Sequence, residues 1–290
     1  IVKTVLNQIK DLVTFLRRTS EKLVSLNQEE EKIRLILEVF DNVNKSNSNC
    51  KKISEIVLSP FKISYAKNSA NDRPFELFSE EEIAIEVGDV AILYGPSGSG
   101  KSTFMKMLTE RVKLEKSADI PVASRYLFFD ETMRLGNLSL FEELFCGETE
   151  NSDLKKMQTI LEGLHLWIEI QNNCSDVWSW LREKNFNHSL SNGQKQRLVL
   201  AKMLYWLDDG IDCVVLDECT SGLDDRSNKE GEASAQDILE FAVRYINKER
   251  KRIVIIASHQ NLDEFQESLK DICTFKIYDF ERTSFGSVVR

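Results

Sequence analysis

Residues 90–102 read Val-Ala-Ile-Leu-Tyr-Gly-Pro-Ser-Gly-Ser-Gly-Lys-Ser, an apolar run followed by the spacing G-x-x-x-x-G-K-S. Glycines at these positions allow backbone angles that turn successive N–H groups inward, and they let the chain approach a phosphate closely. A helix that starts at the final serine adds the positive end of its dipole. The stretch therefore predicts a strand, a phosphate-binding loop and a helix, and with them a nucleoside triphosphate site.

The residues of this loop have separate expected tasks. Lys101 places a compact positive charge against the outer phosphates, and the hydroxyl of Ser102 is positioned to ligate Mg²⁺. The residues expected to bind the nucleotide here are Gly95, Pro96, Ser97, Gly98, Ser99, Gly100, Lys101, Ser102 and Thr103. A glycine-rich turn without a ligand is the alternative, and the strand–loop–helix context disfavours it.

A second apolar run, Val214–Leu216, ends in the pair Asp217-Glu218. Carboxyl ends of parallel strands meet at one edge of a sheet, so Asp217 is expected beside the phosphate loop, where a carboxylate suits Mg²⁺. Glu218 is expected to polarise the water that attacks the γ-phosphate. Two acids at a strand end are common by themselves, and they become informative because the phosphate loop precedes them.

Short β-rich runs alternate with helical runs after residue 50, and this alternation predicts an α/β fold with a mainly parallel sheet. The expected strands are Ser54–Leu58, Ile83–Val87, Val90–Tyr94, Arg125–Phe129, Cys213–Leu216, Ile253–Ala257 and Thr274–Tyr278. The expected helices are Ser102–Val112, Leu154–Leu164, Gly193–Leu207 and Gln236–Lys248. An antiparallel β-rich part is expected near residues 54–94, and a helical subdomain at about 131–190.

The first 50 residues have a different character. Apolar side chains recur at helical spacing from Val2 to Leu16 and again from Glu29 to Phe40, and the polar tract 44–49 follows. We therefore expect a helical extension over 1–50 and a nucleotide-binding domain over 51–290. A helical hairpin packed on the same domain is the alternative. Because the chain opens with Ile1 and has no signal-peptide pattern, we expect it to be a piece of a longer protein.

Composition excludes several classes of protein. The 290 residues carry 38 basic and 47 acidic side chains, a formal net charge of −9. Nucleic-acid binding needs a basic face that displaces counterions, so nucleic acid is not an expected partner. No run approaches the ~18 apolar residues that span a bilayer. The six cysteines are scattered as single thiols, which indicates a reducing compartment. None of them has the spacing of a zinc site, so no zinc is expected.

Three further motifs carry a resemblance to a known family. Leu190-Ser-Asn-Gly-Gln194 resembles the signature of ABC-type ATPases, usually Leu-Ser-Gly-Gly-Gln. Ser221-Gly-Leu-Asp224 resembles the D-loop, and Ser258-His259 resembles the switch histidine of that family. With the phosphate loop and Asp217-Glu218, five motifs stand in the family's order between about residues 54 and 280. Asn192 replaces a glycine, and we interpret the change as mild because Asn tolerates left-handed backbone angles.

The resemblance implies a head-to-tail dimer with a second ABC cassette, identical or different. In the family two ATP molecules lie between the phosphate loop of one cassette and the signature of the other. The signature residues that would act on the partner's ATP are Ser191, Asn192, Gly193 and Gln194. Such a cassette hydrolyses ATP with Mg²⁺.

The resemblance also assigns roles within one chain. Glu218 is the general base, His259 orients the γ-phosphate and the water, and Asp224 belongs to the D-loop. Tyr65 stands at about the place of the aromatic that stacks on adenine. Phe75 and Phe78 are alternatives for that role, and a core or surface role for the tyrosine stays open.

One position departs from the family pattern. The family usually carries a glutamine after the strand at 125–129, and here we align Asp130 with it. A carboxylate is a harder magnesium ligand than an amide oxygen, but it has no N–H to donate. The expected metal ligands are therefore Ser102, Asp217 and Asp130, in a functional but atypical site. The same loop couples the family's cassettes to their membrane partners.

Three functions remain in competition. The first is the nucleotide-binding domain of an exporter-type ABC transporter, at the cytoplasmic face of a membrane, with a transmembrane domain fused upstream of Ile1. The second is a soluble ABC ATPase that does not transport. The third is a weakly hydrolysing regulatory cassette, which the substitution at Asp130 favours and the intact Asp217-Glu218 pair disfavours.

Overall fold

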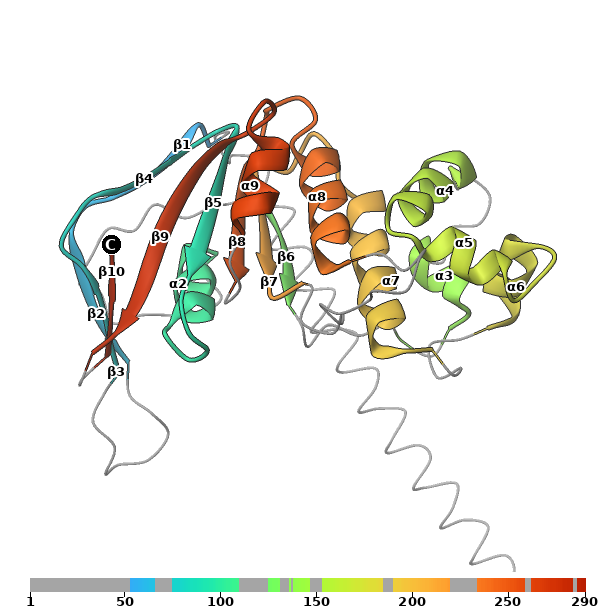
Figure 1. Ribbon diagram of the computed structural model, residues 1–290, viewed down its shortest axis with the longest axis horizontal. Helices are drawn as coiled ribbons and strands as arrows, with labels where there is room; N and C mark the ends of the chain where they lie inside the picture. The colour runs from blue at the N-terminus through green and yellow to red at the C-terminus, as the bar shows by residue number, and fades with distance from the viewer. Residues whose placement is uncertain are drawn as a thin grey trace, which may run out of the picture. The chain divides into compact units, whose positions relative to one another are not determined.

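A computed structural model describes most of the chain after the first 50 residues (Figure 1). The described residues are 53–65, 75–109, 125–130, 136, 138–146, 153–184, 190–219, 234–258, 262–283 and 286–290. They all belong to one compact unit, residues 52–290. The helical extension that the sequence predicts over 1–50 lies outside the described residues.

An eight-stranded sheet organises the described part of the chain, in the order β2-β3-β10-β9-β5-β8-β7-β6. Its strands are β2 (Phe61–Tyr65), β3 (Phe75–Ser79), β5 (Asp89–Tyr94), β6 (Tyr126–Asp130), β7 (Cys213–Asp217), β8 (Ile253–Ser258), β9 (Thr274–Arg282) and β10 (Gly286–Val289). From β9 to β6 all neighbours are parallel, whereas β2 pairs with β3, and β9 with β10, in antiparallel register. The predicted α/β class with a mainly parallel sheet is confirmed.

A separate antiparallel pair lies near the start of the described residues. It consists of β1 (Glu55–Leu58) and β4 (Ile83–Glu86). These two strands contribute Ile56, Leu58, Ile83 and Ile85 to the same apolar core as Leu77 of β3. The sequence therefore predicted an antiparallel part in the correct segment, and β2 and β3 enlarge it.

The central strands are buried on both faces. In β5, Val90 and Ile92 pack in one apolar core, while Ala91 and Leu93 pack in the other. Successive side chains of a strand point to opposite faces, so a strand covered on both sides is apolar at every position. This explains why β5, β7 and β8 are visible in the sequence as continuous apolar runs.

Helices cover both faces of the sheet (Figure 1). The helix α2 (Lys101–Leu108) belongs to the core that holds Phe61 and Phe280. The other core takes residues from α7 (Asn192–Tyr205), α8 (Ala235–Ile246) and α9 (Asp263–Leu269).

Four short helices lie between β6 and α7 in the sequence and beyond α7 in Figure 1. They are α3 (Leu140–Leu144), α4 (Leu154–Gly163), α5 (Leu166–Gln171) and α6 (Val177–Glu183). They occupy the segment 131–190 in which the sequence predicts only helical or irregular structure.

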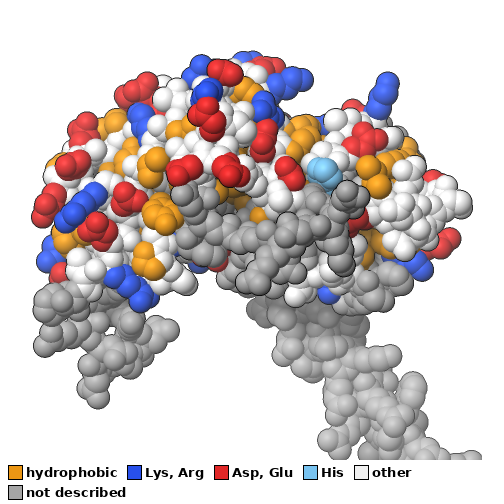
Figure 2. Space-filling model, viewed as in Figure 1, with side chains coloured by type: hydrophobic (Ala, Val, Ile, Leu, Met, Phe, Trp, Pro, Cys, Tyr) orange, Lys and Arg blue, Asp and Glu red, His pale blue; other side chains and the backbone are white. Residues whose placement is uncertain are grey.

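The surface of the described residues carries both signs of charge. Figure 2 shows acidic and basic side chains interspersed over one face, with apolar side chains between them. Among the described residues no helix has the length and apolar character needed to cross a membrane.

Candidate functional site

The phosphate loop joins β5 to α2, and its glycines have the backbone angles that the motif requires. Gly95, Gly98 and Gly100 have φ angles of 150°, 72° and 95°, which side chains with a Cβ rarely adopt. At Gly95 space is lacking as well, since a Cβ would lie 2.5 Å from the carbonyl oxygen of Phe280. The helix α2 then begins after Gly100 without a side-chain cap.

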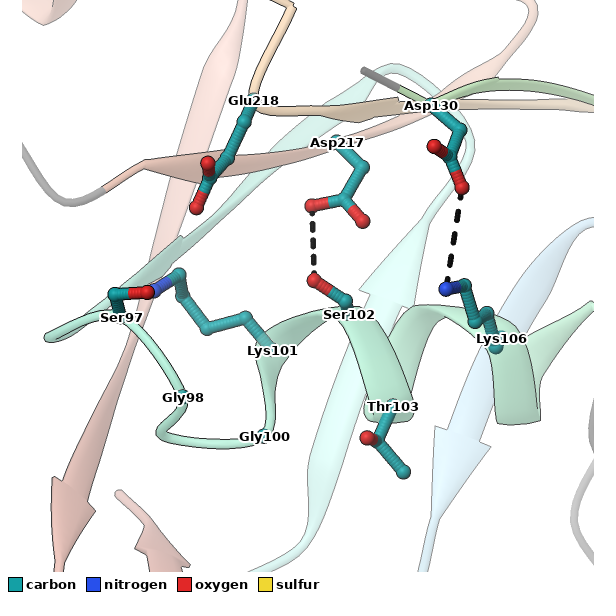
Figure 3. Close-up of a pocket in the computed structure, with 10 residues that line it drawn as sticks. All are labelled: Ser97, Gly98, Gly100, Lys101, Ser102, Thr103, Lys106, Asp130, Asp217 and Glu218. Atoms are coloured by element: carbon teal, nitrogen blue, oxygen red, sulfur yellow. Dashed lines mark hydrogen bonds and ion pairs between the residues drawn. The ribbon is translucent and has the colours of Figure 1, made fainter. Parts of the chain in front are cut away.

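The loop opens into a pocket of about 270 Å³ (Figure 3). Its walls come from the loop, from α2 and from the carboxyl ends of β6 and β7. The lining residues are Ser97, Gly98, Gly100, Lys101, Ser102, Thr103, Lys106, Asp130, Asp217 and Glu218. The parallel register brings the acids together, because Asp130 stands opposite Asp217 on the neighbouring strand.

The ammonium of Lys101 is held inside the loop. Its Nζ donates hydrogen bonds to the carbonyl oxygens of Gly95, at 2.7 Å, and Pro96, at 3.0 Å. The residue is 4% exposed. Burial lowers the pKa of Lys101, and the charges of Glu218 and Asp217 act in the opposite direction. A partly desolvated ammonium whose partners among the described residues are carbonyl oxygens is suited to exchange them for phosphate oxygens.

Asp217 is the buried carboxylate of the pocket. Its Oδ1 accepts a hydrogen bond of 3.1 Å from the hydroxyl of Ser102. The pKa of Asp217 is raised to about 6: burial is the largest cause, the charges of Glu218 and Asp130 act in the same direction, and the bond from Ser102 opposes them. Because burial disfavours the ionised form of this carboxylate, a cation bound next to it would stabilise that form strongly.

The donor set fits a magnesium ion. The Ser102 hydroxyl and the carboxylates of Asp217 and Asp130 are hard oxygen ligands, which Mg²⁺ prefers. The described part of the chain contains no cluster of three or more His, Cys, Asp or Glu side chains that would form a metal site alone. An ion here would therefore complete its coordination with nucleotide phosphates and water, as Mg²⁺ commonly does.

Asp130 has a partner, Lys106, that was not predicted from the sequence. Its Oδ2 lies 3.9 Å from Nζ of Lys106, and the two side chains point toward each other in Figure 3. Lys106 follows Ser102 by four residues on α2, so both project toward the carboxylates. That i+4 spacing from Ser102 is the signal that could have identified Lys106. Thr103, one position later than Ser102, points away from the acids (Figure 3).

Glu218 follows β7 in an unusual backbone conformation. Its φ is 49°, and a residue with a Cβ in the left-handed region costs on the order of 1 kcal/mol. Figure 3 shows its carboxylate over the phosphate loop, near Lys101. Such strain is found at functional sites, where it aims a side chain. The general-base role that the resemblance implies for Glu218 stays a prediction.

The signature forms the start of α7. Ser191 is the N-cap residue: its hydroxyl accepts a hydrogen bond of 3.1 Å from the N–H of Gln194, and its own N–H donates to Oε1 of Gln194 at 3.0 Å. Asn192 is the first helical residue and is not among the described residues with positive φ. The explanation of its tolerance by left-handed angles is therefore wrong, and any residue compatible with a first helical turn fits there. The signature lies outside the pocket of the phosphate loop.

A partly buried network fixes the signature to α5, and its residues were not predicted from the sequence. The carboxylate of Glu169 accepts hydrogen bonds of 3.0 Å from Nε2 of Gln194 and from Nη2 of Arg197. Arg197 is 8% exposed and also donates to the carbonyl oxygen of Leu164 at 3.1 Å. The pairing of Glu169 with Arg197 depends on how α5 and α7 pack, so no local spacing in the sequence predicts it.

The side chains of three predicted site residues lie outside the described part of the chain. His259 and Asp224 lie outside the described residues, although Ser258, just before the histidine, ends β8 opposite Tyr94 at the same sheet edge. Tyr65 ends β2 opposite Phe75, and its side chain is outside the described part. Adenine stacking by Tyr65 stays a prediction.

Replacement of Asp217 by Asn is expected to stabilise the metal-free protein at pH 7. Between pH 4 and pH 6 the carboxyl of Asp217 is protonated in the folded state but ionised in the unfolded chain. The free energy of unfolding therefore falls as the pH rises through this range. The neutral amide removes this penalty, and the free energy of unfolding at pH 7 should rise by about 2–3 kcal/mol. Urea unfolding without metal or nucleotide measures it, at pH 7 and at pH 4.

At pH 4 the variant and the native chain should differ little. The exposed Asp271→Asn is the matched control and should show no gain at either pH. If Asp217→Asn is no more stable than the native chain at pH 7, the raised pKa of Asp217 in the folded state is contradicted.

Comparison with known proteins agrees with these motifs. The sequence model of the family described as "ABC transporter" matches residues 78–221. The ATP-dependent lipid A-core flippase of Cupriavidus pinatubonensis is 27% identical over 172 residues, which are 54% of this chain and 28% of the flippase. The phosphate import ATP-binding protein PstB of Aeropyrum pernix is 29% identical over 197 residues, 59% of this chain and 70% of that protein.

A solved structure titled "RNase-L Inhibitor" superposes with a TM-score of 0.54 and 18% sequence identity, over 84% of this chain and 40% of that one. At this identity the likeness concerns the fold alone. The chain spans about a third of the length of the flippases it matches.

Proposed function

Because the chain carries an ATP-binding cassette of the ABC transporter family, whose members are ATPases, we propose that it drives transport across a membrane by closing on a second cassette when ATP binds. The observation that carries the proposal is one pocket that joins Lys101, Asp217 and Glu218 to the phosphate loop. The signature stands apart from that pocket, so it is available to a neighbouring cassette.

The residues of the pocket supply a mechanism for ATP hydrolysis. The loop glycines and Lys101 bind the phosphates, and water attacks the γ-phosphorus in line with the bond to ADP. Glu218 accepts the proton of that water as the new P–O bond forms and the bond to ADP breaks. A magnesium ion, held by Ser102 and Asp217 with Asp130 as a further ligand, would neutralise charge on the β- and γ-phosphates.

Two residues complete this mechanism by resemblance. His259 would orient the γ-phosphate and the attacking water. Asp224, in the D-loop, would lie between the two cassettes. Both expectations follow from the order of the motifs, and the one for His259 is also supported by the position of Ser258 at the sheet edge that carries the pocket.

The proposed second cassette would bring its signature to this pocket. Ser191 is exposed at the start of α7, and its hydroxyl, the N–H of Gly193 and the helix dipole together suit an anion. The network of Glu169 and Arg197 supports that geometry, because it holds the signature against α5. The two cassettes would then bind two ATP molecules head to tail.

Transport is favoured over the soluble alternative by the named relatives. A flippase and an import ATP-binding protein both match this chain in sequence, whereas the likeness to the RNase-L inhibitor concerns the fold alone. In the proposal, residues 1–50 connect the cassette to a transmembrane domain upstream of Ile1, and the cassette faces the cytoplasm. Nucleic acid is not among the proposed partners.

Reconstitution of the whole protein in lipid vesicles tests the proposal. With ATP and Mg²⁺ added outside, a screen of candidate solutes should find one that both stimulates ATP hydrolysis and accumulates in the lumen. Glu218→Gln vesicles are the matched control and should accumulate none. Hydrolysis that no solute stimulates, with no solute moved, would favour the soluble ATPase instead.

Replacement of Asp130 by Gln is expected to leave turnover similar or to raise it. The amide oxygen can still reach the metal, the added N–H can orient the attacking water, and one negative charge near the phosphates disappears. Steady-state phosphate release measures the effect. A complete loss of hydrolysis would contradict the alignment of Asp130 with the glutamine of the family.

A further inference from the structure

Arg282 contacts the phosphate loop from a distant part of the sequence. It is the last residue of β9, and its Nη2 donates a hydrogen bond of 2.8 Å to the carbonyl oxygen of Ser97. A side chain on Gly98 would collide with the same guanidinium nitrogen. The guanidinium therefore covers the outer side of the loop that binds the phosphates.

The sheet holds Arg282 in this position. Strand alternation puts Phe280 and Arg282 on the same face of β9, and the ring of Phe280 packs against Phe104 of α2 at 5.6 Å between centroids. Arg282 is also paired in register with Ser287 of β10, which is buried. Its backbone is thus held in the sheet, and its side chain lies on the face covered by α2 and the phosphate loop.

The charge of Arg282 is not neutralised locally. Its neighbour Glu281 forms an ion pair with Arg290 at 3.2 Å, and among the described side chains no carboxylate lies within ion-pair distance of Arg282. Its charge acts on Lys101, whose pKa it lowers. The bond to Ser97 uses one of the five N–H donors of a guanidinium, whose planar fork matches phosphate oxygens.

The geometry points to Arg282 as a positioning residue of the nucleotide site, which holds the phosphate loop through Ser97 and adds positive charge beside Lys101 for the nucleotide phosphates. This inference rests on the proposed function of the same site and deepens it. Attraction grows with the charge of the ligand, so Arg282 favours nucleotides with more phosphates over those with fewer.

Calorimetric titration of ATP, ADP and AMP into the full chain tests this role. Arg282→Gln should weaken ATP binding about fivefold, ADP binding by less, and AMP binding by less than twofold, as expected for a partly exposed charge contact. Arg282→Lys should recover part of the loss for ATP. The melting temperature of each variant is measured in parallel and should stay near the native value.

Arg290→Gln is the matched control, because it removes the same charge just after the neighbouring strand β10, at a residue whose side chain pairs with Glu281. It should bind all three nucleotides as the native chain does. Native affinities for Arg282→Gln, or equal losses for ATP, ADP and AMP, would overturn the inference, and so would an equal loss in Arg290→Gln. Failure of the proposed function would look different: the native chain would not bind ATP, or Lys101→Ala would bind it equally well.

Discussion

Replacement of Glu218 by Gln is expected to leave ATP binding intact and to reduce turnover by at least about 100-fold, the contribution of a positioned general base. The glutamine keeps the size of the side chain and the backbone at φ 49°, but it cannot accept the proton of the attacking water. ATP should then persist between the two cassettes. Because ATP supplies contacts to both, the variant should accumulate as a dimer.

Three measurements check this result. Titration calorimetry should give an ATP affinity close to that of the native chain, phosphate release should fall to background, and sedimentation should show a dimer with ATP but a monomer with ADP. The control is Glu249→Gln, whose exposed carboxylate pairs with Lys251, and it should behave as the native chain. Undiminished turnover in Glu218→Gln would remove Glu218 from the mechanism.

Replacement of Lys101 by Ala is expected to weaken ATP binding by about 100-fold or more, because a buried charge-assisted contact to phosphate is lost. Lys101 is 4% exposed, and its ammonium donates to two carbonyl oxygens of the loop, so the alanine leaves no positive charge at that point. Turnover should fall with binding. Burial lowers the pKa of Lys101, so its charge costs folding free energy and its loss should not unfold the protein.

The Lys101 variant is compared with Lys248→Ala, an exposed lysine after α8. Calorimetric titration of ATP and thermal unfolding of both proteins make the comparison. Lys248→Ala should bind ATP normally, and both variants should melt near the native temperature. Normal ATP binding by Lys101→Ala would contradict the role of the phosphate loop.

The fold could be predicted where its signals are local. The strands β5, β7 and β8 are buried on both faces, so their apolar runs define them to within one or two residues. The strand β10 depends on distant partners, since it pairs with β3 about 200 residues away, and it was missed. Antiparallel pairing of β9 with β10 extends β9 from the predicted end at Tyr278 to Arg282. Helices of five to seven residues, such as α5, are too short for periodicity to reveal.

The residues of the site were also predictable where their signals are local in the sequence. The phosphate loop and Asp217 were predicted because glycine spacing and strand ends are local properties of the sequence. Arg282 was missed because it lies 185 residues from its partner Ser97. Lys106 was missed although its i+4 spacing from Ser102 is local, because its role depends on Asp130, which the sheet brings opposite it. Asn192 was accepted for the wrong reason, because the helix begins one residue earlier than the predicted Gly193.

The pairing of two cassettes is tested most directly by mixing two chains, each disabled in a different half of the composite site. Lys101→Ala removes the phosphate contact, and Ser191→Glu places a carboxylate where the signature would meet the partner's γ-phosphate. Each variant alone should hydrolyse ATP at background rate. In an equal mixture half of the dimers are mixed and each has one intact site, so about a quarter of the native activity should return. A mixture no more active than its components, beside a native chain that hydrolyses ATP, would contradict the head-to-tail site.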